Sequence, residues 1–140
     1  KSQVMDVQRR IGISNVLIIQ SAENENFMIE GAFGYRNAGP REFVQLIRNA
    51  ALVCTDSFHA TAICINISVN FVEFVRFDDA DSHSQNSRIY DLLNRYQLNG
   101  RLYSSWDGKA LDNNDYKKIQ TMLENDRKYS LSFLINAIEA

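Results

Sequence analysis

Short apolar runs alternate with amphipathic segments along the first three quarters of the chain. Residues 16–19 and 51–55 are nearly continuous apolar runs, and residues 68–75 are rich in β-branched and aromatic side chains. These patterns are typical of strands buried on both faces of a parallel sheet. In residues 40–50 and 88–96 apolar side chains recur at intervals of three and four, which predicts helices packed on that sheet. The alternation predicts right-handed βαβ units and an α/β fold.

Residues with known positional preferences mark the ends of these segments. Pro40 suits the first turn of a helix, and Asp56 and Ser57 are both good caps for a helix expected over residues 57–66. The pair Asn99-Gly100 is a plausible stop for the helix that begins near residue 88. The sequence therefore predicts a strand-to-helix junction immediately before Phe58.

The remaining parts of the chain are less regular. Residues 21–39 are largely polar and carry three glycines, at positions 31, 34 and 39, which indicates a long loop. Residues 102–106 form a weaker candidate for a fourth strand. Residues 113–140 form a C-terminal helical segment, with a break expected near Asn125 because the apolar phase shifts there. We expect its apolar stripe to pack on the sheet or on another domain, and residues 1–140 to form a single α/β domain.

Composition narrows the classes of function. With 140 residues, 45% hydrophobic and 23% charged, the chain suits one globular domain that can bury a core without disulfides or metal. A formal net charge of −2 argues against nucleic acid as a partner. Cys54 and Cys64 lie in apolar runs, as small buried hydrophobes do, and no apolar run approaches the length of a membrane span. We expect a cytoplasmic protein and, since the chain opens Lys1-Ser2 in a helical pattern, a piece of a longer one.

The segment Thr55-Asp56-Ser57-Phe58-His59 carries the clearest candidate chemistry. Ligands of parallel sheets bind beyond the carboxyl ends of the strands, where this segment is expected to lie. The first turn of the following helix offers N–H groups to a phosphate or carboxylate, and His59 could donate a hydrogen bond or transfer a proton beside it. On local chemistry alone, a simple helix cap next to a partly buried histidine explains the same pattern.

The amino-acid sequence of this segment, taken together with those of its neighbours, resembles one enzyme family. The sequence Val-Cys-Thr-Asp-Ser-Phe-His at residues 53–59 follows Ala-Gly-Pro-Arg-Glu-Phe at residues 38–43. Downstream come Ser-Arg-Ile at residues 87–89, Leu-Leu at residues 92–93, and Leu98 with Arg101. In this order the segments, which cover about residues 38–102, resemble the polysaccharide pyruvyl transferases. One departure is Ala60, because family members often have glycine after the histidine.

The resemblance implies both an architecture and a reaction. It implies a Rossmann-like domain with a parallel sheet, forming the C-terminal half of a two-domain, glycosyltransferase-B-like enzyme. That enzyme would transfer pyruvate from phosphoenolpyruvate to a sugar of an exopolysaccharide or other cell-surface polysaccharide precursor, as a ketal. By motif position His59 is similar to the family's catalytic histidine, Ser57 and Phe58 to its substrate-binding neighbours, and Arg88 to the arginine of the Ser-Arg-Ile segment.

The same resemblance implies the partners and the place of action. The partners are phosphoenolpyruvate, a sugar or lipid-linked glycan acceptor and a missing N-terminal domain, without which this chain would be inactive. No cofactor and no metal are implied. The enzyme would be cytoplasmic, at the inner face of the membrane when its acceptor is lipid-linked.

Several alternatives remain open at this point. The chain could belong to a nucleotide-sugar glycosyltransferase of similar architecture, or be a non-catalytic binding domain. Arg88 is equally explained as a surface arginine of a helix. The acidic segment at residues 78–83 could bind a divalent ion or an acceptor sugar, although such loops are usually only solvated. Tyr96, Tyr103 and Trp106 could stack on a sugar, but core or interdomain packing is the simpler interpretation.

Overall fold

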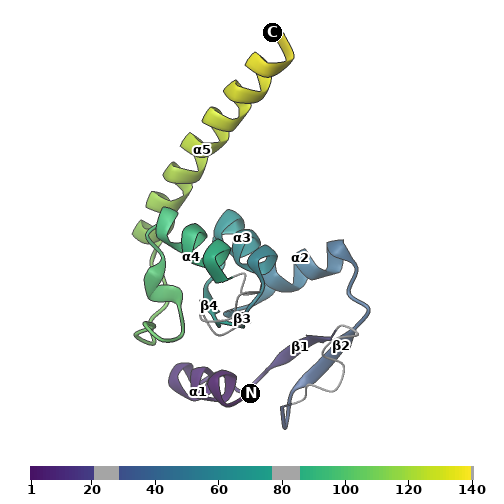
Figure 1. The fold of residues 1–140 in the computed structure, drawn as a ribbon. Helices are drawn as coiled ribbons and strands as arrows, with labels where there is room; N and C mark the ends of the chain where they lie inside the picture. The colour runs from purple at the N-terminus through teal and green to yellow at the C-terminus, as the bar shows by residue number, and fades with distance from the viewer. Residues whose placement is uncertain (21–28, 77–85, 140) are drawn as a thin grey trace.

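Helices and short parallel strands alternate along the chain, as Figure 1 shows. The computed structural model describes residues 1–20, 29–76 and 86–139, and everything said below concerns these residues. The helices are α1 (Ser2–Ile11), α2 (Pro40–Asn49), α3 (Phe58–Ile67), α4 (Asn86–Arg95) and α5 (Asn113–Glu139), with a short 3-10 turn, η1 (Asn99–Arg101). The strands are β1 (Leu17–Gln20), β2 (Phe33–Arg36), β3 (Val53–Thr55) and β4 (Phe71–Glu73). The α/β class predicted from the sequence is confirmed.

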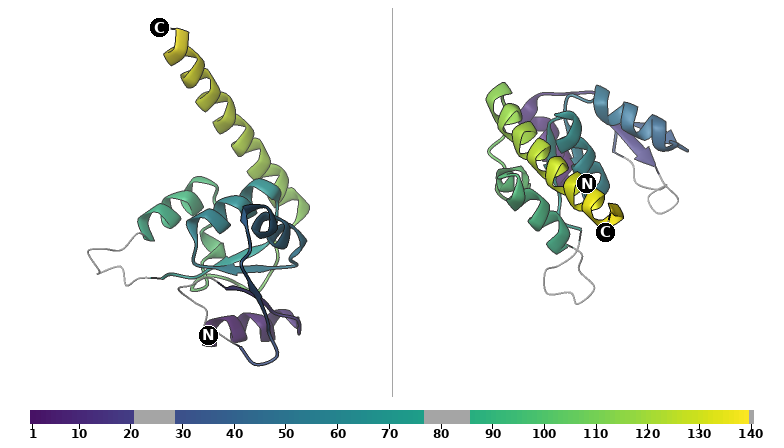
Figure 2. Two further views of the ribbon diagram at one scale, coloured as in Figure 1. Left: turned by 90° about the vertical axis from the view of Figure 1, so that its right-hand side faces the viewer. Right: turned by 90° about the horizontal axis from the view of Figure 1, so that it is seen from above.

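The strands lie between two layers of helices. Helices α2, α3 and α4 lie side by side over one face of β3 and β4, while α1 lies on the other side of the strands (Figures 1 and 2). A large apolar cluster fills the space under α3 and includes Cys64, Phe71 and Leu93. A smaller one joins Val7 of α1 to Val72 and Trp106. Because Phe71 and Val72 are adjacent in β4, one short strand contributes to both clusters.

The strand pairs are parallel, but they do not join into the single sheet that the sequence predicted. β1 pairs with β2, and β3 pairs with β4, which gives two sheets of two strands among the described residues. The unit β3-α3-β4 is the βαβ arrangement that the alternation of patterns indicated. In its register Val53 lies opposite Phe71, and Thr55 opposite Glu73. The carboxyl ends of both strands therefore meet at one edge.

Strands β1 and β2 differ from two of the predictions. Residues 33–36, which we expected to be loop, form β2, and its alignment places Gly34 opposite Ile18. The absence of a side chain at Gly34 leaves room for the end of the Gln20 side chain, whose oxygen would lie 2.6 Å from a Cβ atom at this position. The strand predicted at residues 16–19 forms at Leu17–Gln20, and it was expected to be buried on both faces, yet Leu17 is exposed and alternate residues are buried. A strand with one partner and one covered face alternates in this way.

The candidate fourth strand is not formed. Leu102 makes a single parallel bridge with Glu73, after which the chain turns through hydrogen bonds from Ser105 to Leu102 and from Trp106 to Tyr103. Trp106 and Tyr96 are buried and Tyr103 is half-buried, so their packing role is confirmed.

Arg101, in η1, fastens this turn to β4. Its guanidinium donates through Nε to the carbonyl oxygen of Phe71 at 2.7 Å, and through Nη1 to that of Lys109 at 2.8 Å. The side chain is buried, and burial lowers the pKa of the guanidinium. Arg101, which with Leu98 formed the last part of the family resemblance, thus donates to backbone carbonyls inside the fold, away from the strand-to-helix junction.

Helix α5 is unbroken, contrary to the break expected near Asn125. Asp126 faces α4 and accepts hydrogen bonds from Arg95 Nε at 2.7 Å and from the Tyr96 hydroxyl at 2.8 Å. Ion pairing with Arg95 also lowers the pKa of Asp126. The shift of the apolar pattern at this point marks the place where the helix leaves the domain, as Figure 2 shows.

Beyond Arg127, which donates to the side-chain oxygen of Asn66 at 2.9 Å, every described residue of α5 is exposed. Ile119 and Leu123 are buried against the domain, whereas Leu131, Phe133, Leu134 and Ile138 are each more than half exposed. The first half of the apolar stripe therefore packs on the domain, next to α3. No helix in the described ranges is long and apolar enough to cross a membrane.

The two cysteines are free thiols, as expected. Cys64 is fully buried and Cys54 half-buried. Burial raises the pKa of the Cys54 thiol to about 11 and that of Cys64 to about 12, where Glu73 adds to the rise. Both side chains stay protonated and act as small hydrophobic residues.

Candidate functional site

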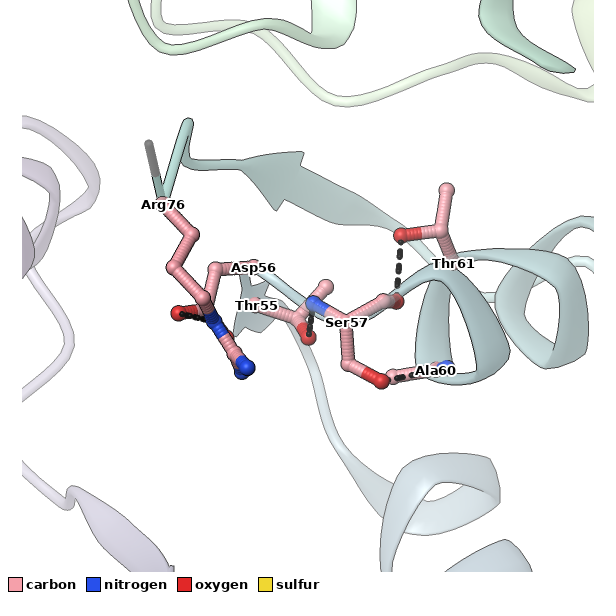
Figure 3. A network of polar contacts seen from close by, with 6 residues as sticks. All are labelled: Thr55, Asp56, Ser57, Ala60, Thr61 and Arg76. Carbon is pink, nitrogen blue, oxygen red and sulfur yellow. Dashed lines mark hydrogen bonds and ion pairs between the residues drawn. The ribbon is translucent and has the colours of Figure 1, made fainter. Parts of the chain in front are cut away.

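The strand-to-helix junction predicted at residues 55–59 is formed, and backbone geometry explains why it ends β3. Ser57 is the N-cap of α3: its hydroxyl oxygen accepts a hydrogen bond from the N–H of Ala60 at 3.5 Å. The Ser57 N–H in turn donates to the hydroxyl oxygen of Thr55 at 3.0 Å (Figure 3). Of the two caps that the sequence allowed, Ser57 is therefore the one used, and Asp56 is left for another contact.

Helix α3 is held deep in the domain, which fixes the position of its first turn. It is apolar on nearly all sides, since α2 and α4 flank it and β3 and β4 lie beneath it. At its far end Ser68 adopts a left-handed conformation, with φ of 58°, and the Gln120 side chain of α5 donates to Ile65 O at 3.1 Å. The first turn is the end that remains accessible.

A shallow hollow of about 150 Å³ opens at this turn. Its described lining comes from three places in the fold: the junction before and at the start of α3, the loop that follows β4, and the first turn of α4. The lining residues are Asp56, Ser57, Phe58, His59, Arg76, Asn86, Arg88 and Ile89. All four residues singled out from the sequence, Ser57, Phe58, His59 and Arg88, therefore lie at one hollow.

His59 stands at the rim of the hollow with its side chain exposed. Its ring meets that of Phe58 edge to face, with centroids 5.9 Å apart and planes at 86°. The partly buried histidine considered from the local pattern is therefore wrong. An exposed imidazole beside a helix N-terminus can donate a hydrogen bond to an anion or exchange a proton with it.

Arg88 reaches the hollow from the first turn of α4. The carbon at the centre of its guanidinium lies 5.5 Å from the centroid of the Phe58 ring, a cation–π contact. Phe58 thus contacts both His59 and Arg88 with its ring. Arg88 is an exposed helix residue, as the simpler interpretation held, but it is directed to the same place as His59.

Arg76 is a member of this hollow that the sequence reasoning missed. It lies three residues beyond the end of β4 and binds Asp56 through two hydrogen bonds, Nε to Oδ2 at 2.9 Å and Nη2 to Oδ1 at 3.0 Å (Figure 3). The pair joins the loops after β3 and β4. A signal was present: Arg76 follows one parallel strand much as Asp56 follows its neighbour, and the carboxyl ends of such strands meet.

A buried carboxyl lies beneath the junction. Glu73, the last residue of β4, has no exposed surface, and its Oε2 is hydrogen-bonded to the hydroxyl of Thr61 in the second turn of α3. Burial raises the pKa of Glu73 to about 8, against the lowering effect of the Thr61 hydrogen bond, and the nearby Asp56 carboxylate contributes to the rise. Such a group is largely protonated at neutral pH.

The arrangement can bind a small anion. Two arginines and a histidine line the hollow together with the Asp56 carboxylate, which is paired with Arg76. The N–H groups of Phe58 and His59 lie in the first turn of α3, where a helix offers no backbone partner of its own. Within the described ranges, no cluster of three or more histidine, cysteine or acidic side chains could hold a metal ion. The acidic segment at residues 78–83 lies outside the described residues.

Comparison with known proteins leaves the family undecided. No family model matches the chain, and neither the curated proteins nor the solved structures contain a significant match to it.

Proposed function

We propose that this chain supplies part of the donor site of a polysaccharide pyruvyl transferase, and that the hollow at the start of α3 binds phosphoenolpyruvate. The single observation that carries the proposal is the convergence of His59, Arg76 and Arg88 on one small hollow at a helix N-terminus. Phosphoenolpyruvate carries a phosphate and a carboxylate on three carbons. Two guanidinium groups and a helix N-terminus suit a compact ligand with two anionic groups.

The lining of the hollow suits the anionic groups of its ligand. Polar and charged side chains predominate among the residues that line it, and its volume is about 150 Å³. Phosphoenolpyruvate and a nucleotide sugar both carry phosphate, so a direct comparison of the two ligands must distinguish them.

The reaction makes definite demands on the site. A proton must be added to the methylene carbon of phosphoenolpyruvate, and a sugar hydroxyl must then attack the neighbouring carbon. The bond from that carbon to the phosphate oxygen breaks, and a second hydroxyl closes the ketal. The site therefore needs a proton donor, a base for the hydroxyls and donors for the departing phosphate.

The residues of the hollow can meet part of these demands. We assign the proton transfer to His59, and the exposure of its imidazole at the rim supports this assignment. Arg88, ordered over the Phe58 ring, can bind a carboxylate or phosphate through its planar fork. The N–H groups at the start of α3 can receive the departing phosphate. We assign the second acid or base and the acceptor sugar to a further domain that faces this hollow, in a glycosyltransferase-B-like architecture.

Isothermal titration of the chain with phosphoenolpyruvate tests the proposal. Inorganic phosphate, pyruvate and a uridine diphosphate sugar serve as comparison ligands. We expect saturable binding of phosphoenolpyruvate in the millimolar range or tighter, stronger than that of phosphate or pyruvate alone, because only the complete ligand engages both arginines. A preference for the nucleotide sugar would support the glycosyltransferase instead, and equal weak binding of all anions would refute a specific donor site.

A further inference from the structure

Glu73 lies directly beneath the junction that forms the hollow. In the register of β3 and β4 it lies opposite Thr55, the residue that accepts a hydrogen bond from the Ser57 N–H. Its backbone is fixed, because its carbonyl accepts from the Tyr103 N–H at 2.9 Å. Its side chain lies on the same face of β4 as Phe71, toward α3, and reaches Thr61. A carboxyl group therefore underlies the first turns of the site helix.

The hydroxyl of Thr61 stands between two oxygen atoms. It lies 3.0 Å from the carbonyl oxygen of Ser57 and is also hydrogen-bonded to Oε2 of Glu73. A hydroxyl group has one proton to donate, and a backbone carbonyl can only accept. With one proton, the Thr61 hydroxyl can donate fully to only one of the two oxygens at a time. Both contacts are satisfied together when Glu73 is protonated and donates to Thr61, so the geometry favours the neutral form of Glu73.

The surroundings of Glu73 favour the same form. Its second oxygen, Oε1, is buried and has no hydrogen-bond partner among the described residues, although a carboxylate would need several donors. The nearby titratable groups are the Asp56 carboxylate, which opposes a second negative charge, and the buried Cys64 thiol. Arg101, whose guanidinium approaches β4 from η1, is directed to the carbonyl of Phe71. The raised pKa of the carboxyl agrees with this environment.

We propose that Glu73 is a positioning residue of the anion site, which holds the start of α3 in place through Thr61 while it is protonated. The proton on Glu73 leaves the Thr61 hydroxyl free to donate to Ser57, the residue that caps the helix. The link to anion binding rests on the proposed function, whereas the protonation and the chain of hydrogen bonds do not. Glu73 does not line the hollow, so it acts through Thr61 and Ser57 rather than on the ligand.

Loss of this proton has two consequences for the site. The Thr61 hydroxyl turns toward the new carboxylate, and the Ser57 carbonyl loses one of its two donors, keeping the N–H of Thr61 at 3.0 Å. A negative charge also appears beneath the turn whose N–H groups face the anion, where it opposes binding. The start of α3 should therefore loosen and anion affinity should fall as Glu73 ionises.

A ligand-free titration tests the proton and its coupling to the helix. We would follow the side-chain carboxyl carbon of Glu73 and the amides of residues 57–61 by NMR from pH 6 to pH 10 in the 140-residue chain. We expect the Glu73 carboxyl and these amides to titrate together with a midpoint near pH 8, and the amide titration to vanish in Glu73→Gln. The proposal would be overturned if the Glu73 carboxyl is ionised throughout this range, or if the chemical shifts of these amides do not change as it titrates.

A pair of substitutions at Thr61 separates positioning from simple proximity. Thr61→Ser keeps the hydroxyl and should keep the amide titration at Ser57 and Phe58. Thr61→Val has nearly the same shape but no hydroxyl, so these amides should no longer follow Glu73. An equal response in both variants would show that Thr61 does not relay the effect.

The ligand arm compares phosphoenolpyruvate affinity at pH 7 and pH 9 in the wild type and in Glu73→Gln. We expect the affinity of the wild type to fall several-fold more than that of the variant, since the two proteins differ only at Glu73. Equal falls would refute the role in anion binding. If phosphoenolpyruvate binds to neither protein, the proposed function fails, and the ligand-free titration still decides the protonation and coupling of Glu73.

Discussion

Arg76 and Asp56 close a two-point ion pair across the carboxyl ends of the central strands, with nitrogen–oxygen distances of 2.9 and 3.0 Å. Asp56 follows β3 and Arg76 follows β4, so the pair ties together the two loops that border the hollow. Because Asp56 fixes the guanidinium at the hollow, Arg76 can meet an anion without first losing the freedom of a long side chain.

Replacement of Arg76 should therefore weaken anion binding. We expect Arg76→Ala to lower the affinity for phosphoenolpyruvate roughly tenfold or more, since a hydrogen bond to a charged group contributes about 1.5–3 kcal/mol. Arg48→Ala is the matched control, because Arg48 is an exposed arginine in the last turn of α2 that does not line the hollow. Calorimetry checks both, and equal losses would mean that only overall charge matters.

Arg88 should be sensitive to the shape of its side chain as well as to its charge. We expect Arg88→Lys to lose most of the affinity that Arg88→Ala loses, because lysine keeps the charge but not the planar group that lies 5.5 Å from the centre of the Phe58 ring. The measurement is the dissociation constant for phosphoenolpyruvate of the three proteins. A lysine variant that binds as well as the wild type would show that Arg88 contributes only its charge to binding.

Replacement of His59 should lower the rate of the reaction but have little effect on folding. In the assembled transferase that we propose, His59→Ala should lower pyruvyl transfer about 10²- to 10⁴-fold, as the loss of a proton-transferring group does. Its side chain is exposed, so the midpoint of thermal unfolding should stay within about 2 °C of the wild type. Activity assays together with thermal scans check this, and retained activity in a folded variant would favour a non-catalytic domain.

Glu73→Gln should stabilise the domain at neutral pH. The pKa of the carboxyl rises from 4.5 to about 8 on folding, so between these values the folded state binds the proton more tightly than the unfolded state. The wild type therefore loses stability as pH rises through this range, by roughly 4–5 kcal/mol in total, while glutamine is unaffected. Urea unfolding at pH 5 and pH 8 should show an advantage for the variant that grows with pH. An advantage that is constant with pH would mean that Glu73 is ionised when folded.

Substitutions in the first half of α5 should lower the free energy of unfolding, whereas substitutions in its second half should hardly change it. Leu123 is buried, so Leu123→Ala should cost about 2–5 kcal/mol of unfolding free energy. Leu131→Gln and Ile138→Gln should change it by less than about 0.5 kcal/mol, because both side chains are exposed, at 58% and 74%. Urea unfolding of the three variants checks the contrast. A large loss from either glutamine variant would show that the tail packs on something in solution.

The parts of the fold that the sequence predicted are those set by local pattern. Helix α2 begins at Pro40 as expected, and Ser57 caps α3, because proline and serine act on the backbone next to them. Strand β2 was missed because its segment is polar and rich in glycine, and only its pairing with β1 makes it a strand. The break near Asn125 was wrong because the shift in apolar phase marks a change of surroundings rather than of backbone, since Asp126 there bonds to Arg95 of α4.

The same division holds for the site. Ser57, Phe58 and His59 are consecutive, so a single motif found all three, while Arg88 was suggested only by resemblance and is brought to them by the packing of α4 on α3. Arg76 and Glu73 were missed for different reasons. Arg76 reaches the hollow only because β3 and β4 are neighbours, and Glu73 looked like one polar residue in an apolar strand. Its burial depends on Thr61, twelve residues earlier.

The most direct test of the central claim is an NMR titration of the labelled chain with phosphoenolpyruvate, with phosphate and a uridine nucleotide as controls. The claim predicts saturable shifts of the amides of residues 55–62, and of the side chains of Arg76 and Arg88, that are strongest for phosphoenolpyruvate. Shifts that are larger for the nucleotide, that are the same for every anion, or that fall elsewhere on the chain would contradict a phosphoenolpyruvate site at the start of α3.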